Sequence, residues 1–272
     1  MTGRTRGRED GGGSVWLAST PSTNDEVRRR WAAGFRGAER FPHLCSVATL
    51  WQTGGRGRHG RQWISPRGAC LAVSTLLRLD AAGPARGALG WLPLLAQLAL
   101  RDALLPLLGA QGPARLRIKW PNDLLLDGGK VSGVLGEVLG ESDGELACVV
   151  GTGVNVLLRP EELPFPGAAS LLAAGVPDPD PAALLEPYLA RFAGRVEALE
   201  AHAWDAVAAG LRAEMLEACV TIGQRVRVGL PGGAGLTGTA IGIAPGGELL
   251  LRDAEGRERT VAAGEVERLR SA

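Results

Sequence analysis

The sequence predicts an α+β fold for residues 14–218, followed by a small β-barrel domain in residues 219–272. Strand-like and helical runs follow one another without the regular alternation that a doubly wound sheet requires. After Cys219, five short strand-like runs appear with glycine-rich turns between them, which is typical of a small closed barrel. The 272 residues are enough for one large domain and one small one.

The N-terminal part of the chain is expected to begin with a disordered tail. Residues 1–13 are rich in Arg, Gly and Asp and lack hydrophobic anchors. An apolar run at residues 15–18 predicts the first strand. A helix is expected to begin at Thr23 and run toward Trp31, because Thr23 and Glu26 have the spacing of a capping box.

Hydrophobic periodicity and turn residues predict the remaining elements. Residues 87–108 have near-continuous apolar positions at helical spacing and predict a core helix. A second helical region is expected at residues 182–211, with an interruption near Pro187. Buried strands are expected at residues 46–51, 69–77, 116–119, 131–138 and 146–150, and barrel strands at residues 225–229, 236–243, 248–251, 258–261 and 266–269.

Charge and cysteine content exclude several classes of protein. Thirty basic and twenty-nine acidic residues give a net charge of +1, which supplies no general attraction to nucleic acid. The four cysteines form no CxxC pair and there are three histidines, which argues against a structural zinc site. The N-terminus lacks the apolar segment of a signal peptide, and we expect no membrane-spanning segment. We therefore expect a cytoplasmic protein with reduced thiols.

Residues 55–61, with the sequence GRGRHGR, lie between two predicted strands. They contain the spacing GxGxxG, but Pro66 and Gly68 prevent the helix that a dinucleotide-binding turn must open. A solvated basic loop or an RNA-binding tract is an alternative, although such tracts are usually longer and lie in tails. We favour a mobile loop that folds over a polyanion, because glycines permit close backbone approach and arginines bind phosphate oxygens.

A second motif, KWPND at residues 119–123, follows a short predicted strand. Either it is an ordinary proline-containing turn, or Asn122 contacts a nucleotide and Asp123 is an oxygen ligand of Mg²⁺. Lys130 follows two glycines and is either solvated or placed to reach a carboxylate or phosphate as a point charge. It is not a Walker A lysine, because the required glycine and hydroxyl residues are absent.

Two further segments carry small polar residues. Residues 151–155, GTGVN, are either a glycine-rich strand end or a surface on which a flat ligand lies. Residues 22–24, STN, either cap the first helix or bind a neutral polar head group such as a ureido ring. Trp51 and Trp63 flank the arginine-rich segment, and we expect both to belong to the core rather than to a ligand wall.

Each of these signals is weak or moderate alone, but their order along the chain resembles the biotin–protein ligase family. The resemblance extends from about residue 15 to the terminal strands, and its most specific parts are residues 55–61 and 119–123. It implies a mixed sheet with flanking helices, like that of class II aminoacyl-tRNA synthetases. It also implies a C-terminal Src-homology-3-like barrel.

The resemblance also implies roles for individual residues. Arg58 and Lys130 are implied to be catalytic, and Asp123 to hold the metal. Biotin is implied to contact Ser22, Thr23, Asn24, Gln52, Gly55, Arg56, Arg58, Lys130 and Gly153. The nucleotide is implied to contact Arg58, Lys119, Trp120, Asn122 and Asn155.

The implied activity is formation of biotinyl-5′-AMP from biotin and ATP with Mg²⁺, and transfer of biotin to a lysine of a carboxylase's biotin carboxyl carrier domain. Alternatives are a lipoate–protein ligase and, from another class, a non-catalytic nucleic-acid-binding adaptor. At position 59 this chain has histidine where some family loops carry arginine, so the charge of the loop at this position is expected to depend on pH. About fourteen residues precede the first strand, so we expect no DNA-binding domain of the kind some members carry. A monomer or homodimer is expected.

Overall fold

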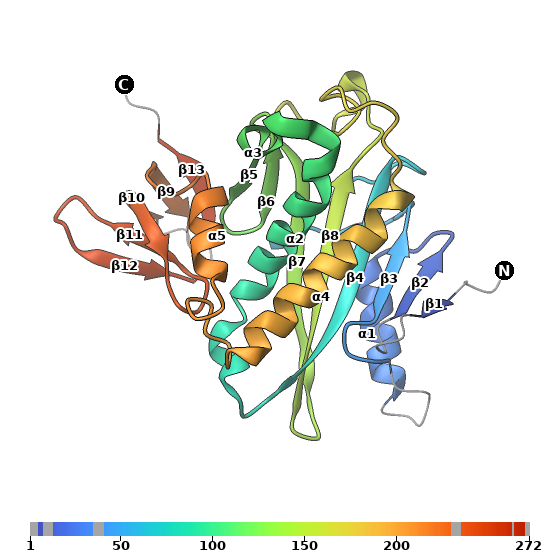
Figure 1. Cartoon of the computed structure of the whole chain (residues 1–272), viewed down its shortest axis with the longest axis horizontal. Coiled ribbons are helices and arrows are strands. Elements are labelled where there is room, and N and C mark those ends of the chain that lie inside the picture. The colour runs from blue at the N-terminus through green and yellow to red at the C-terminus, as the bar shows by residue number, and fades with distance from the viewer. Residues whose placement is uncertain (1–4, 8–12, 35–40, 230–234, 263, 270–272) are drawn as a thin grey trace.

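The computed structural model describes residues 5–7, 13–34, 41–229, 235–262 and 264–269 (Figure 1). Its larger sheet has eight strands in the order β1-β2-β3-β4-β8-β7-β6-β5, and only the β2–β3 pair is parallel. The strands are β1 (Thr5–Gly7), β2 (Gly13–Leu17), β3 (Ser46–Thr49), β4 (Cys70–Asp80), β5 (Leu116–Lys119), β6 (Asp123–Leu126), β7 (Gly129–Ser142) and β8 (Glu145–Asn155).

Helices cover both faces of this sheet. On one face α2 (Trp91–Leu108) and α4 (Leu185–Ala201) pack together and bury the larger apolar core. On the other face α1 (Thr23–Gly34) covers a smaller apolar cluster that includes Val27, Val47 and Val149. Two shorter helices are α3 (Gly112–Arg115) and α5 (Leu211–Ala218), and Figure 1 shows α5 between the large sheet and the C-terminal strands.

Tight Asp-Gly turns set the register of β6, β7 and β8. Asp127 and Gly128 join β6 to β7, and both have a positive φ, at 51° and 82°. Asp143 and Gly144 join β7 to β8 with φ values of 53° and 76°. Positive φ at both central residues matches the twist of antiparallel strands. The sequence interpretation overlooked this signal, so β6 was not predicted and β7 and β8 extend beyond the predicted bounds.

The strand alternation of β7 and β8 places glycine on one face and apolar side chains on the other. Gly133, Gly151 and Gly153 lie on the α1 face, whereas Val134, Val150 and Val154 are buried with the core under α2 and α4. The α1 face therefore has three glycines where β7 and β8 run next to each other, with Leu135 opposite Gly151 on the same face.

The C-terminal strands form a separate antiparallel sheet in the order β12-β11-β10-β9-β13. It is attached to the large domain by two tryptophans: Trp91 Nε1 donates to Pro245 O at 2.7 Å and Trp120 Nε1 donates to Gly247 O at 3.0 Å. The helix that precedes this sheet, α5, ends at Ala218. The strands are β9 (Arg225–Gly229), β10 (Gly235–Ile243), β11 (Leu249–Arg252), β12 (Glu258–Val261) and β13 (Glu265–Arg268).

The N-terminal and helical predictions need correction. The expected tail contributes β1 at Thr5–Gly7, because a backbone ladder with β2 needs no apolar side chain; residues 1–4 and 8–12 of that tail lie outside the described residues. The interruption of the second helical region is not at Pro187, which lies in the first turn of α4, where its missing N–H costs nothing. The break between α4 and α5 is at residues 202–210 instead.

The expected capping box at the start of α1 is also wrong. Thr23 donates its hydroxyl to Gln52, and the Glu26 carboxylate binds Arg29 and Arg30. Ser22 Oγ accepts the Asp25 backbone N–H instead, at 3.4 Å. The Thr23 hydroxyl binds Gln52, which is 29 residues away in the sequence, instead of making the local cap that its spacing predicts.

The predicted core helix ends at Leu108 as expected, and short helical turns continue it to Arg115. Trp91–Arg115, which includes α2 and the short turns after it, is long and apolar enough by composition to cross a membrane. Most of the apolar part of this stretch is buried in the fold, and α2 packs against α4, β7 and β8. It is the core helix of the larger domain.

Candidate active site

A cavity of about 800 Å³ opens on the α1 face of the large sheet. Its floor is the glycine strip of β7 and β8, and one wall is the start of α1. Residues 55–63 lie over it, and residues 119–123 and the C-terminal sheet form the opposite wall. Segments from five parts of the chain therefore meet at one hollow.

The glycines of the floor are required by close contacts. A Cβ on Gly151 would lie 2.1 Å from Asn24 Oδ1. A Cβ on Gly153 would lie 2.5 Å from Cε2 of the Trp63 ring, and one on Gly133 would be 3.3 Å from the same ring. Trp63 thus lies directly on the strip, and any larger residue there would displace it.

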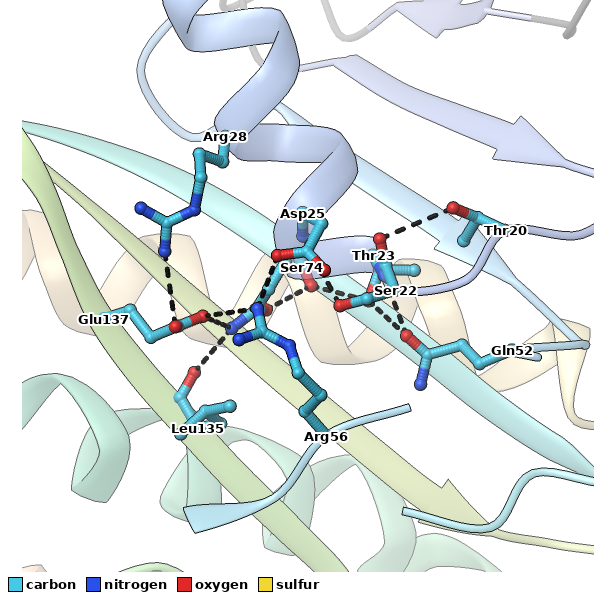
Figure 2. A network of polar contacts seen from close by, with 11 residues as sticks. Thr20, Ser22, Thr23, Asp25, Arg28, Gln52, Arg56, Ser74, Leu135 and Glu137 are labelled. Atoms are coloured by element: carbon cyan, nitrogen blue, oxygen red, sulfur yellow. Dashed lines mark hydrogen bonds and ion pairs between the residues drawn. The ribbon is translucent and has the colours of Figure 1, made fainter. Parts of the chain in front are cut away.

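The wall at the start of α1 is a small polar cluster. Gln52 Oε1 accepts the Thr23 backbone N–H at 2.8 Å and lies 3.1 Å from Thr23 Oγ1. Ser74 on β4 is fully buried, and its Oγ is 2.6 Å from Thr23 Oγ1 and 2.6 Å from Asn24 Oδ1. Figure 2 shows these side chains in one continuous group. Short hydroxyl and amide side chains held in this way suit a neutral polar ligand.

Residues 55–63, the arginine loop, form a narrow hairpin. Gly57 N donates to Arg61 O at 2.7 Å, and Trp63 N donates to Gly55 O at 2.9 Å. At its tip His59 has a φ of 55°, the left-handed region, and its side chain is exposed. The backbone of the loop is therefore internally satisfied, and its arginines are available to other parts of the protein.

The three arginines of the loop reach three different walls. Arg56 is 2.5 Å from Asp25 Oδ1 on α1. Arg58 donates to Asn122 Oδ1 at 3.1 Å and to Gly264 O of the C-terminal sheet at 3.2 Å. Arg61 forms an ion pair with Glu265. Burial lowers the pKa of the Arg58 guanidinium, and the charges of Asp123 and Glu265 act in the opposite direction. The loop is thus fastened across the mouth of the cavity.

Lys130 and Asp123 form the charged pair inside the cavity. Lys130 Nζ is 2.6 Å from Asp123 Oδ1, and both side chains are about a quarter exposed or less. The ammonium also lies 5.9 Å from the centre of the Trp63 ring, a cation–π distance. The chain contains only two lysines, Lys119 and Lys130, and both line this cavity.

Most of the residues predicted for the site are brought together. The cavity is lined by Ser22, Thr23, Asn24, Gln52, Arg56, Arg58, Lys119, Trp120, Asn122, Asp123, Lys130 and Gly153. Gly55 and Asn155 are not among its lining residues. Gly55 is buried beneath Trp63 and Gln52, and Asn155 is buried with Nδ2 donating to Ala169 O at 3.0 Å. Both support the loop and strand that carry lining residues.

Sequence reasoning missed some lining residues and one lining role. Trp63 was expected in the core, but it covers the glycine strip, and only its place beside the arginine loop pointed to this. Glu265 comes from a strand more than two hundred residues away from the loop it binds. Trp120 lines the cavity but is only 2% exposed, and its indole N–H is used by Gly247, so it holds the two domains together.

Known proteins resemble both parts of the chain. Residues 17–155 match the biotin/lipoate A/B protein ligase family, and residues 221–269 match the biotin protein ligase C terminal domain. A biotin–[acetyl-CoA-carboxylase] ligase of Mycobacterium tuberculosis is 38% identical over 96% of this chain and 92% of its own length. One of Paracoccus denitrificans is 37% identical over 91% of this chain and 97% of its own length.

Solved structures agree with the sequence relatives. The biotin protein ligase of Aquifex aeolicus in complex with biotin and ATP superimposes with a TM-score of 0.71 at 26% identity, covering 95% of this chain and 99% of that one. The predicted fold class is confirmed: a mixed sheet with flanking helices of the class II synthetase type, with a Src-homology-3-like C-terminal domain. The chain therefore belongs to the biotin/lipoate A/B protein ligase family.

Proposed function

We propose that this chain is a biotin–protein ligase that activates biotin with ATP and transfers it to a carrier-domain lysine of an acyl-CoA carboxylase. The observation that carries the proposal is the arginine loop fastened across a glycine-floored cavity that contains Lys130. The relatives from M. tuberculosis and P. denitrificans are named biotin–[acetyl-CoA-carboxylase] ligases, and the A. aeolicus enzyme was solved with biotin and ATP.

The two substrates are assigned to opposite ends of the cavity. The ureido head of biotin lies against Ser22, Thr23 and Gln52, where hydroxyl and amide groups offer both donors and acceptors. ATP lies toward Lys119 and Asn122, beneath the arginine loop. The biotin carboxylate and the α-phosphate then meet near Lys130, between these two ends.

Activation is an in-line displacement at phosphorus. The biotin carboxylate attacks the α-phosphate, the bond to the β-phosphate oxygen breaks, and pyrophosphate leaves. The protein contributes positioning and charge neutralisation. Lys130 lies between the two ends of the cavity and Arg58 binds Asn122 at the nucleotide end, so we assign these two cations the stabilisation of the developing negative charge.

A magnesium ion fits this site only as a partner of the nucleotide. Among the described residues no group of three His, Cys, Asp or Glu side chains could hold a metal alone. Asp123 offers one carboxylate in the cavity, and magnesium is commonly held by one or two carboxylates together with substrate phosphates. Asp123 is therefore the proposed protein ligand, and the ion would neutralise phosphate charge.

Transfer requires that the product of activation stays bound. Biotinyl-5′-AMP is a mixed anhydride that water or stray amines can consume, so the loop excludes water until the carrier arrives. The carrier lysine attacks the biotinyl carbonyl and AMP leaves. Asp123 is the candidate base for that amine, since it is the carboxylate inside the cavity beside Lys130.

Several expectations accompany this proposal. The protein partner is a biotin carboxyl carrier domain, and the location is the cytoplasm. A lipoate–protein ligase is the nearest alternative, because the family model includes both kinds of enzyme. The nucleic-acid adaptor is not favoured, because the loop arginines bind the protein itself. Monomer and homodimer both stay open.

The proposed function is tested by exchange of labelled pyrophosphate into ATP. We expect exchange that depends on biotin and is absent with lipoate, because the head wall of Thr23 and Gln52 presents polar groups that a dithiolane ring cannot use. Exchange with lipoate alone, or none with biotin, would contradict the assignment of substrate. Transfer of biotin to a carrier domain then completes the test.

Gly153→Ala is expected to weaken biotin binding by about fivefold to 150-fold. The new methyl group would overlap the Trp63 ring, and such overpacking costs about 1–3 kcal/mol. Calorimetric titration with biotin measures the effect. Gly194→Ala on α4 is the control, because nothing lies within 4 Å of its added Cβ. Wild-type affinity for Gly153→Ala would show that the Trp63 ring does not shape the biotin site.

A further inference from the structure

A continuous set of polar contacts connects the head wall of the cavity to the arginine loop through one carboxylate, Glu137 (Figure 2). Glu137 is on β7, on the same face as Gly133, and it ends the glycine floor. Its side chain is only 20% exposed. It was not among the residues that sequence motifs indicated, because a single glutamate in a strand carries no recognisable pattern.

One oxygen of Glu137 determines the orientation of Asn24. Asn24 Nδ2 donates to Glu137 Oε2 at 2.7 Å and to Leu135 O at 3.2 Å, which uses both amide hydrogens. Asn24 Oδ1 is 2.6 Å from Ser74 Oγ and lies against Gly151. Asn24 is therefore fixed from three sides, and its place next to Thr23 at the head wall depends on Glu137.

The same carboxylate is an anchor for the loop. Arg56 Nη2 lies 3.5 Å from Glu137 Oε2 and 2.5 Å from Asp25 Oδ1. Asp25 is 51% exposed, so its attraction to Arg56 is strongly screened by water and salt. Glu137 is the less exposed of the two, and its charge acts through a less polarisable medium. Arg28 on α1 binds the other oxygen at 3.3 Å.

We infer that Glu137 is a positioning residue that holds the arginine loop shut on the acyl-adenylate. It does so by anchoring Arg56 and by fixing Asn24 beside the head wall. It is not among the residues that line the cavity, so it acts on retention of the intermediate and not on the displacement at phosphorus. This inference rests on the proposed biotin-activating function.

The test uses Glu137→Gln in the full-length enzyme. Glutamine keeps a carbonyl oxygen for Asn24 but removes the charge that attracts Arg56. The enzyme is loaded with biotin and Mg-ATP without carrier, and dissociation of biotinyl-5′-AMP is followed in a chase with unlabelled biotin. We expect dissociation about tenfold faster, while single-turnover pyrophosphate release at saturating substrates changes less than about threefold.

Three further variants test the result. Arg28→Gln removes the other arginine at the same carboxylate without touching the loop, so its dissociation rate should equal that of the wild type. Arg56→Gln removes the opposite end of the contact and should raise the rate as Glu137→Gln does. The double variant Arg56→Gln/Glu137→Gln should release more slowly than the product of the two single effects predicts, because the contact between these residues is lost only once. If Glu137→Gln does not fold, Arg56→Gln compared with Arg28→Gln decides the question.

Unchanged dissociation in a folded Glu137→Gln enzyme would overturn the inference. So would a loss of pyrophosphate release that parallels the loss of retention, or a lowered unfolding temperature with normal retention, since either gives Glu137 another role. If the wild-type enzyme forms no biotinyl-5′-AMP at all, the proposed function itself fails, and that outcome is separate from the others.

Discussion

Lys130→Ala is expected to abolish formation of biotinyl-5′-AMP, with a loss of about 10²–10³-fold or more in single-turnover pyrophosphate release. Lys130 is one of only two lysines in the chain, and its ammonium lies inside the cavity between the head wall and the nucleotide end. Without it, the negative charge that develops between the biotin carboxylate and the α-phosphate has one fixed cation fewer. Pyrophosphate release at the wild-type rate would contradict the assignment.

The ion pair with Asp123 provides a control for this result. Lys130 Nζ lies 2.6 Å from Asp123 Oδ1, so removing Lys130 leaves the Asp123 carboxylate without its counter-charge. The uncompensated carboxylate would repel phosphate. The double variant Asp123→Asn/Lys130→Ala removes that repulsion. If Lys130 neutralises charge in the transition state, the double variant is much less active than Asp123→Asn alone, which measures the cost of losing the proposed magnesium ligand. Recovery of activity in the double variant would mean that the loss came from the uncovered carboxylate.

Arg58→Gly is expected to release the acyl-adenylate and raise biotinylation of added bystander proteins about tenfold or more per adenylate formed. Arg58 makes two charge-assisted hydrogen bonds, to Asn122 and to Gly264, and losing one such bond costs about 1.5–3 kcal/mol. The loop then opens more often, and the mixed anhydride escapes to outside amines. Labelling of a lysine-rich bystander protein, followed by mass spectrometry, measures the effect.

The low lysine content of the chain reduces background labelling of the enzyme in this assay. The enzyme itself offers Lys119 and Lys130 as its only lysines, so labelling of the bystander is not obscured by labelling of the enzyme's surface. Arg61→Gly is the matched control, because its pair with Glu265 is mostly exposed and therefore worth little. A fall in total activity without extra bystander labelling in Arg58→Gly would give Arg58 a role in activation alone.

Much of the site could be predicted because its residues occur in short motifs that stay local in the fold. Residues 22–24 begin a helix, residues 55–61 form a hairpin, and residues 119–123 form one turn, so each motif acts as a unit. Their order along the chain resembled one family. The fold class followed in the same way, from strand and helix patterns that depend on near neighbours.

The missed residues have their partners far away in the sequence. Glu137 meets Asn24 and Arg56 across 113 and 81 positions, and Glu265 meets the loop only because the C-terminal sheet docks beside it. A local sequence pattern contains no information about contacts between residues this far apart. Gly55 and Asn155 belong to motifs that line the cavity, but they do not line it themselves. Gly55 packs against Trp63 and Gln52, and Asn155 donates to Ala169 O.

The attachment of the C-terminal sheet limits how freely this protein can be recombined. Trp91 and Trp120 each bind a backbone carbonyl of the turn between β10 and β11, and a Cβ on Gly90 would lie 2.4 Å from Gly246 O in that turn. A C-terminal module taken from a relative would dock only if it carried a turn of the same shape, with glycine where Gly246 and Gly247 stand. Designers of chimeric ligases should therefore transplant this turn together with the strands, and the two tryptophans with their acceptors.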